Sequence, residues 1–205
     1  MYSISVFGDS ITFGRGNNIN RGWVGRLRKV FEQKDPYNAV YNLGVPGDTS
    51  KDLVKRFDVE ASSRIKYLRE GDRHVIILAI GLNDSRLNKG KVETSLKDFE
   101  KNVNSLIKKA KKHTKEILII GLTPVDEILT KDYEDTSFSN ERIQKYNDLL
   151  REISFKQGIP FLDIFSELSL INYEILLKDG LHPNSEGYKE IFELVKIFLE
   201  ENKIL

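Results

Sequence analysis

Two kinds of hydrophobic segment alternate along this chain of 205 residues. Short, mostly apolar runs predict five strands, at 2–7, 38–43, 74–80, 116–121 and 159–163. Between and after them, apolar residues recur at helical spacing, which predicts helices at 22–34, 49–69, 96–110, 140–157 and 185–201. Strands that alternate with helices are typical of an α/β fold with a mainly parallel sheet and right-handed crossovers. The length fits a single domain, 1–205.

The amino-acid composition argues against several classes of function. Lys and Arg number 32 and Asp and Glu number 31, a balance that argues against a nucleic-acid partner, because such proteins carry a basic excess. The chain has no cysteine, so disulfides, thiol catalysis and cysteine-bound metals are excluded. No cluster of metal-ligating residues is visible, and we expect neither a metal nor a cofactor.

The first seven residues already include the predicted strand 2–7, and they lack the features of a signal peptide. No apolar run approaches the roughly 18–20 residues that a membrane-spanning helix needs. We therefore expect a cytoplasmic protein with a small-molecule partner. No pattern indicates the oligomeric state.

Unusual polar loops follow four of the predicted strands. They are Gly8-Asp9-Ser10, the segment 42–48 that contains Gly44, Gly81-Leu82-Asn83-Asp84, and Asp179-Gly180-Leu181-His182-Pro183. The carboxyl ends of parallel strands meet at one edge of a sheet, where α/β proteins bind their ligands. We expect these loops to lie together at that edge.

Ser10 is a candidate nucleophile, because it stands where a strand gives way to a loop. Asp179 and His182 can form a short loop in which the carboxylate contacts one imidazole nitrogen and leaves the other as a base. Taken alone, the pair has an ordinary explanation, in which Asp179 caps a turn and His182 is a surface residue.

Two further residues can donate hydrogen bonds to an oxyanion. Gly44 lets a backbone N–H approach closely, because no Cβ intervenes. Asn83 supplies a neutral NH₂ donor. Each is equally at home in a turn, but the four loops together favour an active site. We also expect Asp9 and Asp84, the neighbours of Ser10 and Asn83, to contact the substrate.

At this point the chain resembles the GDSL or SGNH hydrolase family. The resemblance rests on four blocks in the family's order between residues 7 and 187: Phe7-Gly8-Asp9-Ser10, the glycine block 42–50, Gly81-Leu82-Asn83-Asp84 and Asp179-Gly180-Leu181-His182-Pro183. One departure is Leu82, where the family often has a small residue. The Gly-x-Ser-x-Gly elbow of the α/β-hydrolases is absent around Ser10.

The resemblance implies a three-layer α/β/α fold like flavodoxin with a five-stranded parallel sheet. It also implies roles for particular residues. Ser10 would be the nucleophile, His182 the base and Asp179 the acid that orients it. The oxyanion hole would comprise the Ser10 and Gly44 backbone N–H groups and the Asn83 side chain.

The expected activity is hydrolysis of carboxylic esters, and the acyl and alcohol groups stay open. A carbohydrate O-acetylesterase, a thioesterase and a lysophospholipase are alternatives. A catalytically silent binding module is an alternative of another class, as is a flavodoxin-like nucleotide binder, although no Gly-x-Gly-x-x-Gly follows the first strand. Loops 85–92 and 122–138 are expected to wall the site, the second as a lid or simply packed on its helix. Arg15, Asn17 and Asn18 are further candidates for substrate contact or for shaping their loop.

Overall fold

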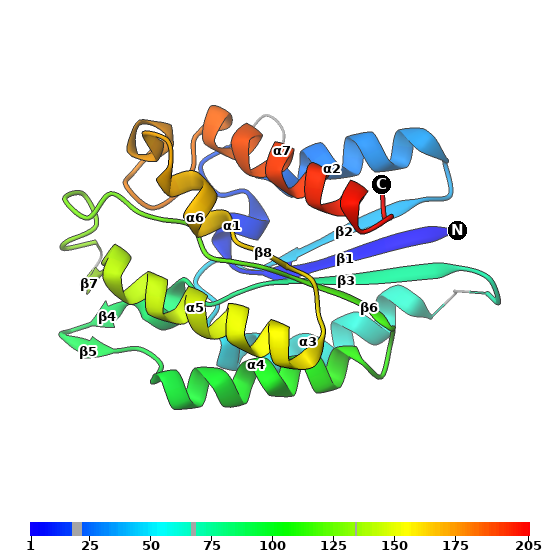
Figure 1. Ribbon diagram of the computed structural model, residues 1–205, viewed down its shortest axis with the longest axis horizontal. Coiled ribbons are helices and arrows are strands. Elements are labelled where there is room, and N and C mark those ends of the chain that lie inside the picture. Colours follow the sequence, from blue (N-terminus) through cyan, green and yellow to red (C-terminus); the bar gives the residue numbers. More distant parts are fainter. Residues whose placement is uncertain (18–21, 67–68, 134) are drawn as a thin grey trace.

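Five parallel strands form the central sheet of the computed structural model, in the order β2-β1-β3-β6-β8 (Figure 1). The structure describes residues 1–205 except 18–21, 67–68 and 134. The strands are β1 (Tyr2–Gly8), β2 (Ala39–Gly44), β3 (Arg73–Ala79), β6 (Glu116–Ile120) and β8 (Phe161–Leu162). This arrangement confirms the expected α/β fold with a five-stranded parallel sheet.

Helices cover both faces of the sheet. Helices α2 (Gly22–Lys34) and α7 (Ser185–Glu201) lie side by side on one face (Figure 1). The other face carries α3 (Ser50–Ile65), α4 (Leu96–Ala110) and α5 (Asn140–Gln157), packed in that order. Because both faces are covered, the strand segment 74–78 is buried along its length, as its continuous apolar run predicts.

Local capping sets several helix boundaries. Helices α2, α5 and α7 begin and end at the predicted residues. Ser139 caps the start of α5, and Gly158 ends it in the left-handed conformation, with φ of 64°. Helix α3 starts with a capping box between Thr49 and Asp52 but ends at Ile65, four residues before the predicted boundary of 69; residues 67 and 68 lie outside the described part of the chain.

A second, antiparallel sheet was not predicted. It joins β4 (Leu87–Asn88), β5 (Lys91–Val92) and β7 (Thr136–Ser137) in the order β5-β4-β7. Strands of two residues carry no periodic signal. Short helices α1 (Ser10–Phe13), η1 (Asn83–Ser85), α6 (Ile164–Ser169) and η2 (Tyr173–Leu176) complete the fold. The last two lie between β8 and the loop that carries Asp179 and His182.

None of the helices that the structure describes has the length and apolar character required to cross a membrane.

Candidate active site

The four polar loops meet at the carboxyl edge of the sheet. Ser10 follows β1, Gly44 ends β2 and Asn83 follows β3. Strand β1 pairs with β2 on one side and β3 on the other, so the chain reverses its direction of winding beside β1. Such a switch point opens a crevice in an α/β sheet. The topology therefore places Ser10 at the position where this fold binds ligands.

Ser10 is the first residue of the short helix α1. The Asp9 side chain caps this helix by accepting a hydrogen bond from the Ile11 N–H at 2.9 Å. Gly14 ends the helix in the left-handed conformation, with φ of 91°. The Ser10 backbone N–H has no backbone partner among the described residues, as expected in a first helical turn. Its N–H and its side chain are thus both presented at the strand edge.

His182 and Asp179 occupy a tight loop before α7. Ser10 Oγ lies 3.0 Å from His182 Nε2, and Asp179 Oδ2 lies 2.8 Å from His182 Nδ1. Asp179 Oδ1 also accepts hydrogen bonds from the backbone N–H groups of Leu181 and His182. The structure therefore aligns serine, imidazole and carboxylate in one hydrogen-bonded chain.

The electrostatics of this chain favour an ionised carboxylate. Burial by itself raises the pKa of Asp179, but hydrogen bonds from the backbone and the imidazole of His182 outweigh it and hold that pKa below its usual value. Tyr133 adds a longer contact, with its hydroxyl 3.4 Å from Asp179 Oδ2 and its ring edge-on to the imidazole. His182 itself is buried, so its orientation is fixed by these neighbours.

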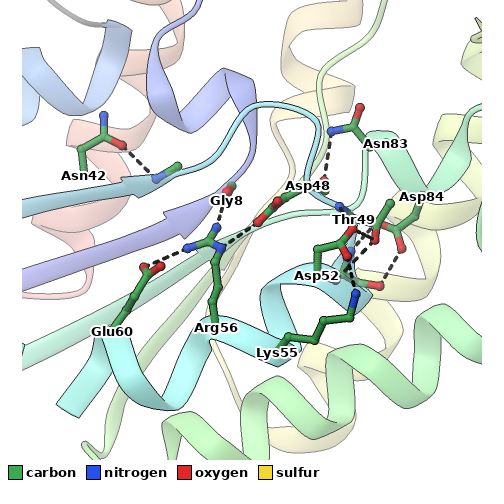
Figure 2. A network of polar contacts seen from close by, with 12 residues as sticks. Gly8, Asn42, Asp48, Thr49, Asp52, Lys55, Arg56, Glu60, Asn83 and Asp84 are labelled. Atoms are coloured by element: carbon green, nitrogen blue, oxygen red, sulfur yellow. Dashed lines mark hydrogen bonds and ion pairs between the residues drawn. The ribbon is translucent and has the colours of Figure 1, made fainter. Parts of the chain in front are cut away.

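Gly44 lies against the first turn of α1. A Cβ at this position would come within 2.3 Å of the Phe13 N atom and 2.7 Å of the Asp9 carbonyl oxygen, so only glycine fits. The Gly44 N–H donates to Asn42 Oδ1 at 3.0 Å (Figure 2). The Asn42 amide in turn donates to the Thr12 carbonyl. Gly44 thus packs against α1 with its N–H engaged by a neighbouring side chain, and the glycine of this loop that lines the cavity at Ser10 is Gly47.

The Asn83 side chain is held at both ends. Its Nδ2 donates to the Asp48 carbonyl at 3.0 Å (Figure 2), and Arg86 donates to its Oδ1 at 3.4 Å. These contacts fix which end of the amide carries the donors.

A half-buried arginine anchors the loop that supplies the Asp48 carbonyl. The Arg56 guanidinium binds the Asp48 carboxylate at 2.6 Å, the Gly8 carbonyl at 2.9 Å and Glu60 at 2.9 Å (Figure 2). It therefore ties the loop after β2 to the end of β1, two residues before Ser10. Sequence reasoning missed Arg56, because a charged residue within a predicted helix gives no sign that it contacts a distant loop and strand.

Asp9 and Asp84, which we expected to contact the substrate, lie in the interior of the protein. Both are buried, and neither lines the cavity at Ser10. Asp9 caps α1, while Asp84 accepts hydrogen bonds from the backbone N–H and the hydroxyl of Ser50 at 2.8 and 2.6 Å. Burial raises the pKa of Asp9 to about 7 and also raises the pKa of Asp84. In this structure the two carboxyl groups hold the start of α1 and the start of α3 in place next to the site.

A cavity of about 300 Å³ opens over Ser10 and His182. Both predicted wall segments reach it, since Asn88 and Lys89 come from 85–92 and Tyr133, Thr136 and Phe138 come from 122–138. The small antiparallel sheet joins these two segments into one wall.

The first loop contributes to the same region. Arg15 lines the cavity and an adjoining hollow of about 540 Å³, which Asn17 also lines. Asn18 lies outside the described residues.

Comparison with known proteins defines the family. The model of the GDSL-like Lipase/Acylhydrolase family matches residues 6–190. The chain belongs to this family, and it is an ester hydrolase. The comparison with curated proteins found no match.

Solved structures share the fold over nearly the whole chain. The lipase/acylhydrolase from Enterococcus faecalis has a TM-score of 0.79 at 21% identity and covers 98% of this chain and 97% of its own. A member of the lipolytic protein G-D-S-L family from Veillonella parvula has a TM-score of 0.68 at 20% identity, with coverage of 96% and 97%. Axe2, an acetylxylan esterase from Geobacillus stearothermophilus, has a TM-score of 0.72 at 18% identity, with coverage of 96% and 93%.

Proposed function

We propose that the protein hydrolyses small carboxylic esters through Ser10, His182 and Asp179. The observation that carries the proposal is the chain of contacts in which Ser10 Oγ lies 3.0 Å from His182 Nε2 and Asp179 lies 2.8 Å from His182 Nδ1. Family membership supplies the reaction class. The same three residues satisfy the geometric test for a nucleophile, a base and a group that orients the base.

In the proposed mechanism, His182 Nε2 takes the Ser10 proton as Oγ attacks the ester carbonyl. Asp179 accepts the Nδ1–H, which keeps Nε2 as the base and stabilises the imidazolium that forms. The imidazolium then protonates the leaving alcohol. Water, deprotonated by His182, attacks the acyl-enzyme and releases the acid and free Ser10.

Two donors beside Ser10 Oγ can stabilise the oxyanion. The Ser10 backbone N–H has no backbone partner among the described residues, and Asn83 Nδ2 retains a second hydrogen beyond the one given to Asp48. The third expected donor, the Gly44 N–H, donates to Asn42 Oδ1, and Gly44 lines the adjoining hollow and not the cavity over Ser10. Removal of a single oxyanion donor costs on the order of 10²–10³ in rate in other hydrolases.

The size of the cavity favours a short acyl or alcohol group. Its volume of about 300 Å³ is at the lower end for small-molecule sites, which does not suit a long lipid chain. A carbohydrate O-acetylesterase is the second candidate, supported by the acetylxylan esterase among the similar folds. Thioesterase and lysophospholipase activities stay as alternatives with no observation in their favour.

The first test is Ser10→Ala with a short-chain p-nitrophenyl ester. We expect kcat to fall by on the order of 10³-fold or more, with an unchanged circular dichroism spectrum. Ser63→Ala is the matched control, because Ser63 is exposed on α3 and bonds only to its own helix. Substantial hydrolysis by Ser10→Ala would refute the mechanism, and a wild type that hydrolyses no ester would favour a silent binding module.

A further inference from the structure

Cationic side chains surround the proposed active site. Arg15, Arg86 and Lys89 line the cavity over Ser10, and Asp135 is the one carboxylate among its lining residues in the described part of the chain. The whole chain carries a formal net charge of only +1. The positive charge at this cavity is therefore a local feature and not a reflection of overall composition.

Two of these cations, Arg15 and Lys89, have no side-chain partner among the described residues. Arg86 contacts Glu93 at 3.3 Å and Asn83 Oδ1 at 3.4 Å, so its charge is partly used. The side chains of Arg15 and Lys89 make no hydrogen bond or ion pair with any residue that the structure describes, and both residues are exposed. Even Asp135, on the same cavity, forms no ion pair with them within the described residues.

The backbones that carry the two cations are nevertheless fixed. The Arg15 N–H donates to the Ser10 carbonyl at 3.0 Å, and its own carbonyl accepts from the Tyr188 hydroxyl at 2.8 Å. Lys89 stands at the turn between β4 and β5 in the left-handed conformation, with φ of 49°, and its N–H donates to the Asp135 carbonyl at 3.2 Å. Both charges are thus anchored at the cavity, although the side chains remain free to bind.

Resting on the proposed ester hydrolysis, we propose that the substrate carries an anionic group, a carboxylate or a phosphate, which Arg15 and Lys89 bind while Ser10 attacks the ester. Unpaired cations around one cavity attract anions and raise their local concentration. A guanidinium binds a carboxylate or phosphate with two parallel hydrogen bonds, and an ammonium adds a compact charge. Arg15 also borders the adjoining hollow beside Gly44, so it can reach either arm of an ester.

The test uses esters that differ only in charge. On the alcohol side, we compare meta-acetoxybenzoate with its neutral methyl ester and with meta-acetoxyphenyl phosphate. On the acyl side, we compare monophenyl adipate with methyl phenyl adipate. Hydrolysis is followed by proton release. The wild type should favour the anionic ester on at least one side by about 10-fold in kcat/KM, the value of one charged hydrogen bond.

Variants identify the groups responsible. Lys89→Gln and Arg15→Gln should each lower the ratio of anionic to neutral kcat/KM by about 10-fold. Lys91→Gln is the control, since Lys91 is exposed on the same hairpin but does not line the cavity, and it should leave the ratio unchanged. The wild-type ratio should also fall when KCl rises from about 20 mM to about 500 mM.

The outcomes separate this inference from the proposed function. Hydrolysis of the neutral esters with no preference for either anion, or with a ratio unaffected by both Gln variants, would overturn the anionic substrate and leave ester hydrolysis intact. If no ester is hydrolysed, the proposed function fails, and the inference fails with it. The carboxylate and phosphate arms decide which anion is preferred.

Discussion

Asp9 is a buried acid next to the proposed nucleophile. Burial raises its pKa to about 7, and the nearby carboxylates of Asp84 and Asp48 add to this rise, against the hydrogen bond from the Ile11 N–H. The ordinary value in an unfolded chain is 3.8. The folded protein therefore binds more protons than the unfolded chain between these two values, so the free energy of unfolding falls as pH rises from about 4 to about 7.

Asp9→Asn should remove this pH dependence. Asn also accepts the capping hydrogen bond from Ile11 but carries no charge. At about pH 8 the variant should be more stable than the wild type by roughly 2–4 kcal/mol, and the difference should shrink toward about pH 4. Urea unfolding of both proteins across this range measures it.

Another buried group titrates in the opposite sense. Burial lowers the pKa of His74 to about 4, so the protein loses stability as pH falls below the ordinary value of 6.5. The wild type and Asp9→Asn both contain His74. Its contribution therefore cancels in the difference between their free energies of unfolding. Parallel stability profiles for wild type and Asp9→Asn would contradict an elevated pKa for Asp9.

Among the elements, the wall of the cavity depends on contacts from a helix behind it. The Arg142 side chain, on α5, donates to the Ser85 carbonyl at 3.1 Å and to the Ser137 carbonyl at 3.1 Å. Ser85 belongs to the loop after β3 and Ser137 to β7, so one guanidinium connects both segments of the wall. The small antiparallel sheet alone has few backbone hydrogen bonds to hold these segments together.

Arg142→Met should loosen the wall without unfolding the protein. We expect KM for a short-chain ester to rise about 3- to 10-fold, because two carbonyl groups lose their donors. Trypsin should also cleave faster at Lys89, Lys91 and Lys131. Lys145→Met, which removes an exposed pair with Glu141 on the same helix, is the control. Unchanged KM and unchanged cleavage in Arg142→Met would show that the wall does not need this arginine.

At the scale of the whole molecule, one hydrophobic core extends through both faces of the sheet. It includes Trp23 and Val195 from one face, Phe99 and Leu150 from the other, and Ile77 from the sheet between them. We propose on this basis that residues 1–205 form a single domain. Because the sheet is common to both faces, neither layer of helices can keep its packing when the other is lost.

Unfolding should therefore be a single cooperative transition. Trp23, the one tryptophan, reports on α2, whereas far-ultraviolet circular dichroism reports on all the helices. The two signals should have the same midpoint in urea. Separate midpoints would indicate two units and contradict the single domain.

Most of the fold could be predicted from the sequence, because its signals are local. The continuous apolar run 74–80 predicts a buried strand, and the helical spacing of apolar residues in 185–201 predicts an amphipathic helix. Capping preferences identify Ser139 and Gly158 as the ends of a helix. The carboxyl ends of parallel strands share one edge of the sheet, and this rule alone predicts that the polar loops lie together. These features need no knowledge of which distant side chains meet.

The rest of the site depends on contacts that no local pattern reports. Asp9 and Asp84 were expected to contact the substrate, but the fold buries both, Asp9 as the cap of α1 and Asp84 in hydrogen bonds with Ser50. Arg56 and Arg142 act through backbone carbonyls far away in sequence, and such carbonyls are chemically the same at every residue. Lys89 reaches the cavity only because two short strands pair across the molecule.

Covalent labelling of Ser10 tests the central proposal most directly. A fluorophosphonate reacts with a serine only when a neighbouring base activates it. Incubation of the wild type should add one adduct, which mass spectrometry should locate at Ser10 in the tryptic peptide 1–15. Labelling should be absent in Ser10→Ala and strongly slowed in His182→Ala. No adduct in the folded wild type, or an adduct on another residue with Ser10 unmodified, would contradict Ser10 as the nucleophile.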